Sequence, residues 1–212
     1  MTEAPAHDRG TRSREAILDT ATDLMSRHGY AATSISMISA ACGLPASSIY
    51  WHFGSKDGIY VAVLQRARIT LETALPSIDV PGADVAQRLD SFLEALTVVF
   101  QRHPHGTKLL LGLSMLQQSA SAEAVAELHR YRDTLMAWAR GALSRVFDLG
   151  DRPEVSEELA RFTLRTASGT AVARWFEPAA SLDIEPLRVA LRALAAHRSG
   201  VPAGKTPRVG HP

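Results

Sequence analysis

The sequence of 212 residues lacks several features that would indicate particular classes of protein. It has one cysteine, Cys42, which excludes an internal disulfide and a cysteine-based zinc cluster and fits a reducing cytoplasm. No stretch approaches the roughly 18 consecutive apolar residues of a membrane helix, and we expect no secretory signal in the polar N-terminal segment. Lys and Arg number 23 against 22 Asp and Glu, a formal net charge of +1. Bulk electrostatics therefore indicate no partner.

Patterns typical of enzymes and metal sites are also missing. Residues 112–114, Gly-Leu-Ser, lack the closing glycine of a nucleophile elbow, and no dinucleotide-binding fingerprint occurs. His103, His105 and His129 have no third ligand at the spacing of a zinc site. We therefore expect no enzymatic activity, no metal and no cofactor.

Helical periodicity runs along most of the chain. Apolar residues from Ile17 to Met25 recur at helical spacing, in a helix that Thr11 or Ser13 caps and Gly29 ends. No segment has a convincing strand pattern. The sequence therefore predicts an all-α fold.

Two short helices follow the first one. They are predicted over 34–42 and from Pro45 to about residue 53, with a tight turn at Gly43 between them. Ser55 then caps a fourth helix from Lys56 to about residue 75. Two short helices joined by a glycine turn are typical of a helix-turn-helix motif, whose second helix enters the major groove of DNA.

The cluster of helix-breaking residues over 76–82 marks the best domain boundary in the chain. Beyond it we expect helices over 83–102, 106–118, 121–148, 154–176 and 184–198. The predicted division is a flexible arm over 1–10, a helix-turn-helix domain over 11–56, a linking helix over 57–75, a larger helical domain over 76–198 and a disordered tail over 199–212.

One string of residues is more specific than the helical pattern. SIYWHFGSK over 48–56, preceded by GYAATS over 29–34 and by Ile38 and Gly43, resembles the N-terminal domain of the TetR family of transcriptional regulators. The resemblance covers about residues 11–60. It implies a DNA-binding regulator, most often a repressor, whose second domain binds a small effector and forms a homodimer on a palindromic operator. A helical-bundle enzyme and a dimeric scaffold are the competing interpretations, and neither explains the string.

Phosphate contacts are expected at the end of the recognition helix. Tyr50 and His52 lie in its last turn, where a hydroxyl and an imidazole can reach phosphates. Lys56 lies in the first turn of the next helix, where a cation opposes the helix dipole unless a phosphate binds there. The alternatives are a packing role for Tyr50 and a solvated cap for Lys56.

The remaining candidate contacts are mostly hydroxyls. Thr33 and Ser34 begin the second helix, where family members place a hydroxyl against a phosphate, and the alternative for both is N-capping. The recognition helix lacks Arg, Asn and Gln, so base readout is expected from serine hydroxyls and from methyl contacts to thymine. The candidate DNA-binding residues are Thr33, Ser34, Ser36, Ala46, Ser47, Ser48, Tyr50, Trp51, His52 and Lys56.

Charge within residues 1–75 is balanced. Seven basic and seven acidic residues cancel there, so the segment is not a basic domain of the kind usual in DNA-binding proteins. Arg9, Arg12 and Arg14 precede the first helix and are expected either to act as an arm that reaches DNA or to be solvated.

The second domain contains two further sets of candidates. The dimer interface is expected at Ser168, Gly169, Ile184, Leu187, Leu191 and Leu194, on two late helices that TetR relatives pair with their copies. The alternative is that this stripe is buried within one subunit. The effector, of unknown identity, is expected at Leu109, Leu113, Met115, Leu116, Tyr131, Leu135, Trp138 and Phe162, for which ordinary core packing is the alternative.

Overall fold

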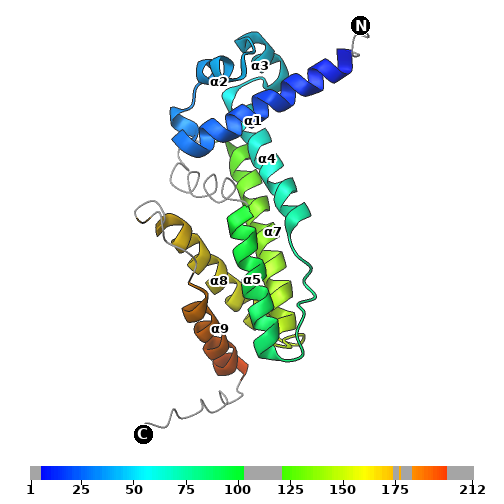
Figure 1. Cartoon of the computed structure of the whole chain (residues 1–212), viewed down its shortest axis with the longest axis vertical. Helices are drawn as coiled ribbons and strands as arrows, with labels where there is room; N and C mark the ends of the chain where they lie inside the picture. Colours follow the sequence, from blue (N-terminus) through cyan, green and yellow to red (C-terminus); the bar gives the residue numbers. More distant parts are fainter. Residues whose placement is uncertain (1–5, 103–120, 174–176, 178–182, 200–212) are drawn as a thin grey trace. The chain divides into compact units, whose positions relative to one another are not determined.

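The computed structural model describes residues 6–102, 121–173, 177 and 183–199, and all regular structure in these ranges is helical (Figure 1). The helices are α1 (Ala6–Ala32), α2 (Ile35–Cys42), α3 (Ala46–Phe53), α4 (Lys56–Ala74), α5 (Val85–Arg102), α7 (Ala122–Val146), α8 (Pro153–Ala173) and α9 (Ile184–Ser199). The all-α prediction is confirmed. The helix expected over 106–118 and the tail expected from residue 199 fall outside the described residues or at their edge. Among the described helices, none has the length and apolar character needed to cross a bilayer.

The first helix starts earlier than the sequence suggested. It begins at Ala6, so neither Thr11 nor Ser13 caps it, and Arg9, Arg12 and Arg14 lie inside it rather than on an arm before it. Ala6 and Arg9 are good helix formers, and the single Gly10 does not stop the helix. Gly29, where the sequence predicted the end of the helix, has φ 81° and ψ 163° and interrupts the helical backbone, but α1 extends to Ala32.

The helix-turn-helix boundaries follow local capping chemistry. The Ser34 side chain accepts a hydrogen bond from the backbone of Met37 and caps α2. Gly43 ends α2 in the left-handed region, with φ 71° and ψ 13°. Pro45 is the N-cap of α3, one position before the first-turn site that its sequence context suggested. Ser55 caps α4 by accepting from the Gly58 amide at 3.0 Å.

Contacts divide the chain into two compact units. Unit 1 contains, among described residues, 6–75, 100–102 and 121–134, and unit 2 contains 76–99, 135–173, 177 and 183–199. The first half of α7 therefore belongs with the N-terminal helices, whereas the sequence placed all of 76–198 in one domain.

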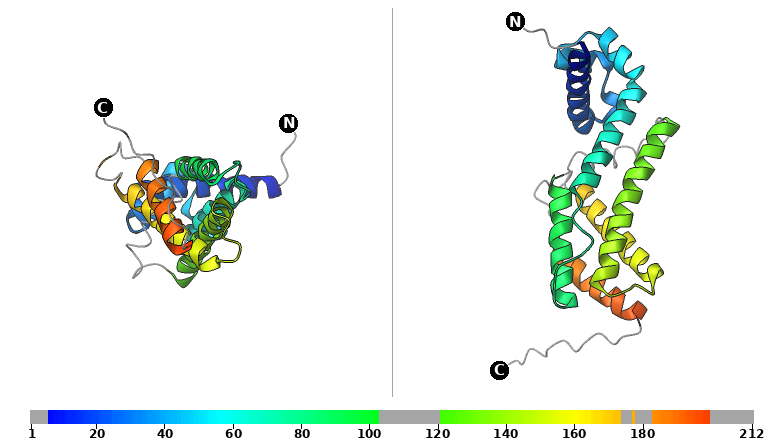
Figure 2. Two further views of the ribbon diagram at one scale, coloured as in Figure 1. Left: turned by 90° about the horizontal axis from the view of Figure 1, so that it is seen from below. Right: turned by 90° about the vertical axis from the view of Figure 1, so that its right-hand side faces the viewer.

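The core of unit 1 joins every helix of its N-terminal part. Ile17, Ile38, Ile49 and Ile59, one from each of α1 to α4, are completely buried in a cluster that also contains Leu128 of α7. The right-hand view of Figure 2 shows α1, α2 and α3 gathered beside the start of α4, in agreement with the contacts among these helices. Burial of one isoleucine from each helix fixes the helix-turn-helix on α1 and α4.

Unit 2 has a core of its own. The Phe92 and Trp138 rings stack with centroids 5.5 Å apart, and the Trp138 indole N–H donates to the Pro76 carbonyl at 2.9 Å. Leu187 and Leu191 of α9 are buried within the same chain, where α9 packs on α8.

Candidate nucleic-acid interface

The outer side of α3 carries two exposed aromatic residues. Tyr50 and Trp51 are 53% and 79% exposed, and Ser47 lies beside them at helical spacing. Ile49 is buried on the opposite side of the helix and fixes the orientation of α3. A tryptophan this exposed is unusual for a soluble protein and indicates a binding surface.

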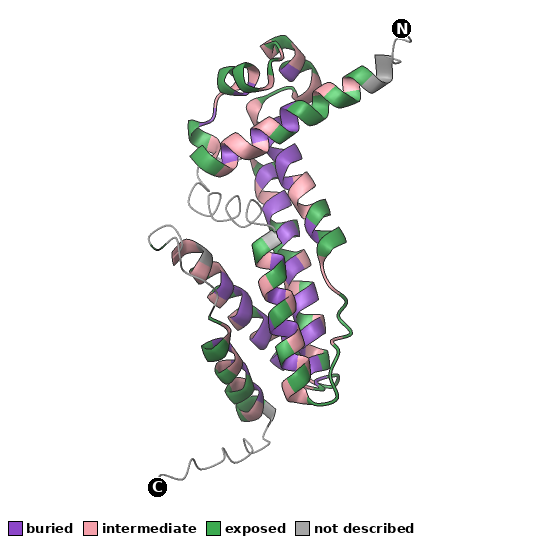
Figure 3. Cartoon of the chain, viewed as in Figure 1, coloured by how far each residue is buried: buried purple, intermediate pink, exposed green. Residues whose placement is uncertain are grey.

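Exposed residues occur along α2 as well as α3 (Figure 3). We call the combined surface the α2–α3 face; its exposed residues are Ser36, Met37, Ala40, Ala41, Pro45, Ser47, Tyr50 and Trp51. No Lys, Arg, Asp or Glu occurs between Arg27 and Lys56, so the face carries no formal charge. Its chemistry is that of hydroxyls, methyl groups and aromatic rings.

A hydrogen bond inside the turn holds the two short helices together. The Ser39 hydroxyl donates to the Leu44 carbonyl at 2.6 Å, and Leu44 packs against the core of unit 1. The turn thus has a polar and an apolar anchor in addition to the left-handed Gly43. The sequence analysis missed Ser39, whose position inside a short helix gave no sign that its hydroxyl serves the following turn.

Lys56 has partners already in the free chain. Its Nζ donates to the Ala31 carbonyl at 3.1 Å and lies 4.4 Å from the centroid of the Tyr30 ring. Burial lowers the pKa of the Lys56 ammonium below its usual value. The contact satisfies a carbonyl at the C-terminal end of α1, where backbone acceptors lack helical partners and a cation is favoured. Lys56 is therefore not a solvated cap, yet an ammonium has three donors, so a phosphate can still bind to it.

Tyr30 connects the end of α1 to the start of α4. Its hydroxyl donates to the Asp57 carboxylate, and its ring stacks on Tyr60 with centroids 4.6 Å apart. Burial raises the pKa of Tyr60 above its usual range. The sequence analysis missed this role, although Tyr30 stands within the string that carries the family resemblance. Together with Lys56, these contacts fix the position of the α4 N-terminus.

Thr33 does not belong among the DNA-binding residues. Its side chain is completely buried, and its hydroxyl donates to the Gly29 carbonyl at 2.8 Å. The expectation of a phosphate contact at Thr33 was wrong because the broken end of α1 supplies an acceptor inside the chain. Ser34 serves as the cap of α2, which was its alternative role, and its hydroxyl lies 2.8 Å from that of the exposed Ser36.

The other candidates lie at the border of the α2–α3 face. Ala46, Ser48 and His52 are half-buried. The His52 ring meets Trp51 edge to face, with centroids 4.6 Å apart. These residues therefore reach the surface only in part, and their contacts to DNA stay predictions.

Gly58 allows the close approach of α3 and α4. A Cβ atom at this position would lie 2.1 Å from the Phe53 carbonyl oxygen, which is backbone and cannot move aside cheaply. A side chain at this position of α4 would therefore require α3 to shift.

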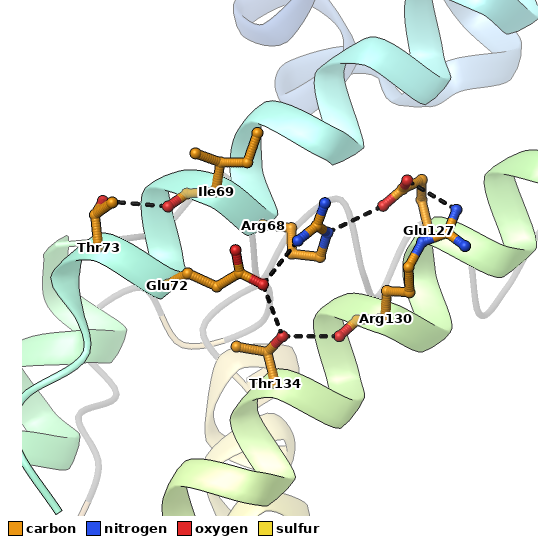
Figure 4. Close-up of polar contacts among 7 residues, drawn as sticks. All are labelled: Arg68, Ile69, Glu72, Thr73, Glu127, Arg130 and Thr134. Atoms are coloured by element: carbon orange, nitrogen blue, oxygen red, sulfur yellow. Dashed lines mark hydrogen bonds and ion pairs between the residues drawn. The ribbon is translucent and has the colours of Figure 1, made fainter.

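An ion-pair cluster joins α4 to the first half of α7 within unit 1 (Figure 4). Glu127 is 3% exposed and accepts from Arg68 at 3.2 Å and from Arg130 at 2.8 Å. Arg68 also donates to Glu72 at 2.7 Å, and Glu72 accepts from Thr134 at 3.3 Å. Burial alone would raise the pKa of Glu127, but hydrogen bonds from both arginines and Gln65 outweigh it and hold the pKa below the usual value.

Glu127→Gln should destabilise unit 1 by about 1 to 2 kcal/mol at pH 7, because a buried carboxylate between two guanidiniums becomes a neutral amide. The pKa of Glu127 is lower in the folded state than in the unfolded state, where it is about 4.3. The ionised carboxylate therefore stabilises the fold at pH values above the unfolded-state pKa, and this stabilisation is lost as the pH falls through the folded-state pKa. The melting temperatures of wild type and variant should therefore differ at pH 7 and converge only as the pH falls through the lowered folded-state pKa of Glu127. Asp133→Asn, which changes a surface carboxylate, is the control and should leave the melting temperature unchanged across this pH range. If wild type and Glu127→Gln differed in melting temperature by the same amount at every pH, Glu127 would not be ionised in this cluster.

The expected dimer residues separate into two groups. Leu187 and Leu191 are buried by the chain itself, so their assignment to an intersubunit surface was wrong; apolar spacing defines a stripe but not what covers it. Gly169 is exposed, with no atom within 4 Å of the place its Cβ would occupy. The half-buried members of the expected set are Ser168, Ile184 and Leu194.

The expected effector residues are only partly described. Leu109, Leu113, Met115 and Leu116 lie outside the described residues. Tyr131, Leu135 and Trp138 are buried, and burial raises the pKa of Tyr131 to about 12. Phe162 is half-buried beside a shallow hollow of about 610 Å³ that Leu194 also lines. The stacking and hydrogen bond of Trp138 correspond to ordinary core packing, which was its alternative role.

Comparison with known proteins supports the interpretation of this interface. The family described as bacterial regulatory proteins, tetR family, matches residues 17–63. The HTH-type transcriptional repressor NicS of Pseudomonas putida is 27% identical over 99 residues, 47% of either protein, so this alignment spans less than half of NicS. The HTH-type transcriptional repressor KstR2 of Rhodococcus jostii is 25% identical over 193 residues, 87% of this chain and 91% of KstR2.

Solved structures show the same fold. The crystal structure of a TetR transcriptional regulator from Legionella pneumophila superimposes with a TM-score of 0.68 at 20% identity, covering 91% of this chain and 98% of that one. The matched region 17–63 contains α2, the turn at Gly43, α3 and the start of α4, and so includes every residue of the α2–α3 face. The N-terminal part of the chain thus matches the tetR family of bacterial regulatory proteins, and the chain has the fold of a solved TetR transcriptional regulator.

Proposed function

We propose that the protein is a repressor that binds a palindromic operator as a homodimer and is released from it by a small apolar molecule. The observation that carries the proposal is the uncharged α2–α3 face, on which Tyr50 and Trp51 stand exposed beside the capped start of α4. NicS and KstR2 are named repressors. A DNA partner also favours action in the cytoplasm.

A palindromic operator implies that the protein binds as a homodimer. Two-fold DNA sites require two recognition helices about 34 Å apart, one turn of the duplex. Since Leu187 and Leu191 are occupied within the chain, we assign the interface to the opposite side of α9, with Val189, and to Gly169 on α8. Val189 is 59% exposed, and Gly169 leaves room for a partner helix to approach closely.

Release by a ligand rests on the family and requires an energetic coupling of about 1 to 3 kcal/mol between the effector and DNA sites. The coupling is reciprocal, so the ligand should weaken DNA binding by the same factor as DNA weakens ligand binding. Apolar metabolites that raise the melting temperature should be titrated against a labelled DNA duplex. A compound that binds without lowering DNA affinity is not an inducer.

DNA binding is tested by mobility shift on fragments from the region upstream of the protein's own gene and on duplexes selected from a random-sequence pool. The proposal predicts one retarded complex whose stoichiometry is two chains per duplex. Equal affinity for every duplex in the pool would contradict a sequence-specific regulator, and binding of one chain per site would contradict the dimer.

Lys56→Ala should weaken binding to all duplexes alike, because a phosphate contact carries no base information. The slope of log K against log salt concentration should decrease in magnitude by about one. The variant also loses the bond to the Ala31 carbonyl, so its melting temperature must be measured beside its affinity. Arg132→Ala, at an exposed cation on α7, is the matched control and should leave the slope unchanged. If the salt dependence of DNA binding by Lys56→Ala had the wild-type slope, Lys56 would not contact a phosphate.

A further inference from the structure

We propose that the protein selects its operator through the C5-methyl groups of thymine, which the α2–α3 face contacts, and not through bidentate hydrogen bonds to guanine or adenine. The inference rests on the proposed DNA-binding function and names the base that the site recognises.

The α2–α3 face lacks the side chains that make paired hydrogen bonds to bases. Guanine and adenine are read in the major groove mainly by Arg, Lys, Asn or Gln, whose side chains make paired hydrogen bonds to two base atoms. None of these residue types occurs from 28 to 55, and the whole chain has no asparagine. Bidentate readout by α2 or α3 therefore has no side chain to perform it.

Several serine hydroxyls of α2 already form hydrogen bonds within the chain. Ser39 donates to the carbonyl of Leu44, and Ser34 accepts from the amide of Met37 as the cap of α2. Ser36 lies within hydrogen-bonding distance of Ser34. Ser47 and Tyr50 are the exposed hydroxyls of the face for which the structure shows no such bond, and one hydroxyl discriminates poorly among bases.

The α2–α3 face exposes large apolar side chains. Met37, Tyr50 and Trp51 are three of the large hydrophobic side chains left exposed in the described chain, and all belong to this one face. Ile69 on α4, the other such residue among the described residues of unit 1, is not part of it. The thymine methyl is the apolar group that base edges present in the major groove. Uncharged, apolar side chains on a recognition helix are complementary to that group.

The test uses a duplex selected from a random-sequence pool, in which each thymine is replaced in turn by deoxyuridine. This change removes the methyl and keeps every hydrogen-bonding group of the base. Burial of one methyl is worth about 0.8 kcal/mol, so each contacted position should weaken binding about fourfold. Thymines outside the footprint should tolerate the change, and the selected duplexes should be rich in thymine where the α2–α3 face meets them.

Two variants of the protein test whether the α2–α3 face makes the thymine contacts. Trp51→Ala removes a side chain that is largely exposed, so the fold should survive; its affinity should fall, and at least one sensitive thymine should become insensitive. Ile69→Ala, an equally simple truncation of an exposed apolar residue in unit 1, should keep both the affinity and the full pattern of sensitive thymines.

The outcomes separate this inference from the function on which it rests. Failure of the wild type to bind any selected duplex would overturn the proposed function itself. Tight, specific binding that is unchanged when all thymines are replaced would overturn the thymine inference alone. A small, uniform weakening at every position, flanks included, would also overturn it, because that pattern reports duplex deformability and not methyl contacts.

Discussion

Leu191→Arg is expected to disrupt the packing of α9 on α8. Val189→Arg, two residues away on the same helix, should keep the fold and weaken the dimer. Leu191 is completely buried, and an unpaired guanidinium at such a site costs several kcal/mol. Val189 faces solvent in the single chain, so an arginine there costs little until a second copy approaches. Thermal unfolding followed by circular dichroism should show a large loss only for Leu191→Arg.

Sedimentation of the two variants completes this test. Val189→Arg should sediment as a folded monomer at micromolar concentration and bind operator weakly, since each half-site is then bound alone. A folded, stable Leu191→Arg would show that the position is not in the core of unit 2. A Val189→Arg that remains dimeric would place the interface elsewhere on the chain.

Gly58→Ala should abolish DNA binding by disrupting the junction of α3 and α4. The added Cβ would lie 2.1 Å from the Phe53 carbonyl oxygen, so α3 must shift relative to the start of α4. Overpacking of this kind costs about 1 to 3 kcal/mol or more, and here it also displaces the Lys56 and Tyr50 side chains on either side of the junction. We expect a lower melting temperature and no retarded complex in a mobility shift.

Gly10→Ala is the matched control for this prediction. Gly10 also lies in a helix, but no atom lies within 4 Å of its Cβ position. Alanine there should stabilise α1 by about 0.5 to 1 kcal/mol through helix propensity. Normal operator binding by Gly58→Ala would mean that the junction relaxes without moving α3, and the role assigned to this glycine would be wrong.

The sequence was informative wherever a local signal determines structure. Ser34, Gly43 and Ser55 mark helix ends through cap chemistry and the left-handed backbone of glycine, and α2, α3 and α4 begin and end within about one residue of the predicted positions. The start of α1 was missed because Thr11 and Ser13 are suitable N-cap residues, and no local signal shows that the helix continues past them to Ala6.

Burial and partners were much less predictable than helix ends. Thr33 and Leu191 have residue types that suit either a surface or an interior, and only tertiary packing decides between them. The bonds of Lys56 to Ala31 and of Glu127 to Arg68 link residues far apart in the chain, which no periodicity shows. The exposed aromatic residues of α3 were found because the family string contains them, and the structure then showed how far they project.

Footprinting on a selected duplex tests most directly the central claim, that two copies of the α2–α3 face bind DNA. The account predicts two protected segments related by two-fold symmetry and about one helical turn apart. A Tyr50→Ala, Trp51→Ala double variant that melts at the wild-type temperature should protect neither segment. Protection by that variant equal to the wild type, or a single protected segment without symmetry, would contradict the account.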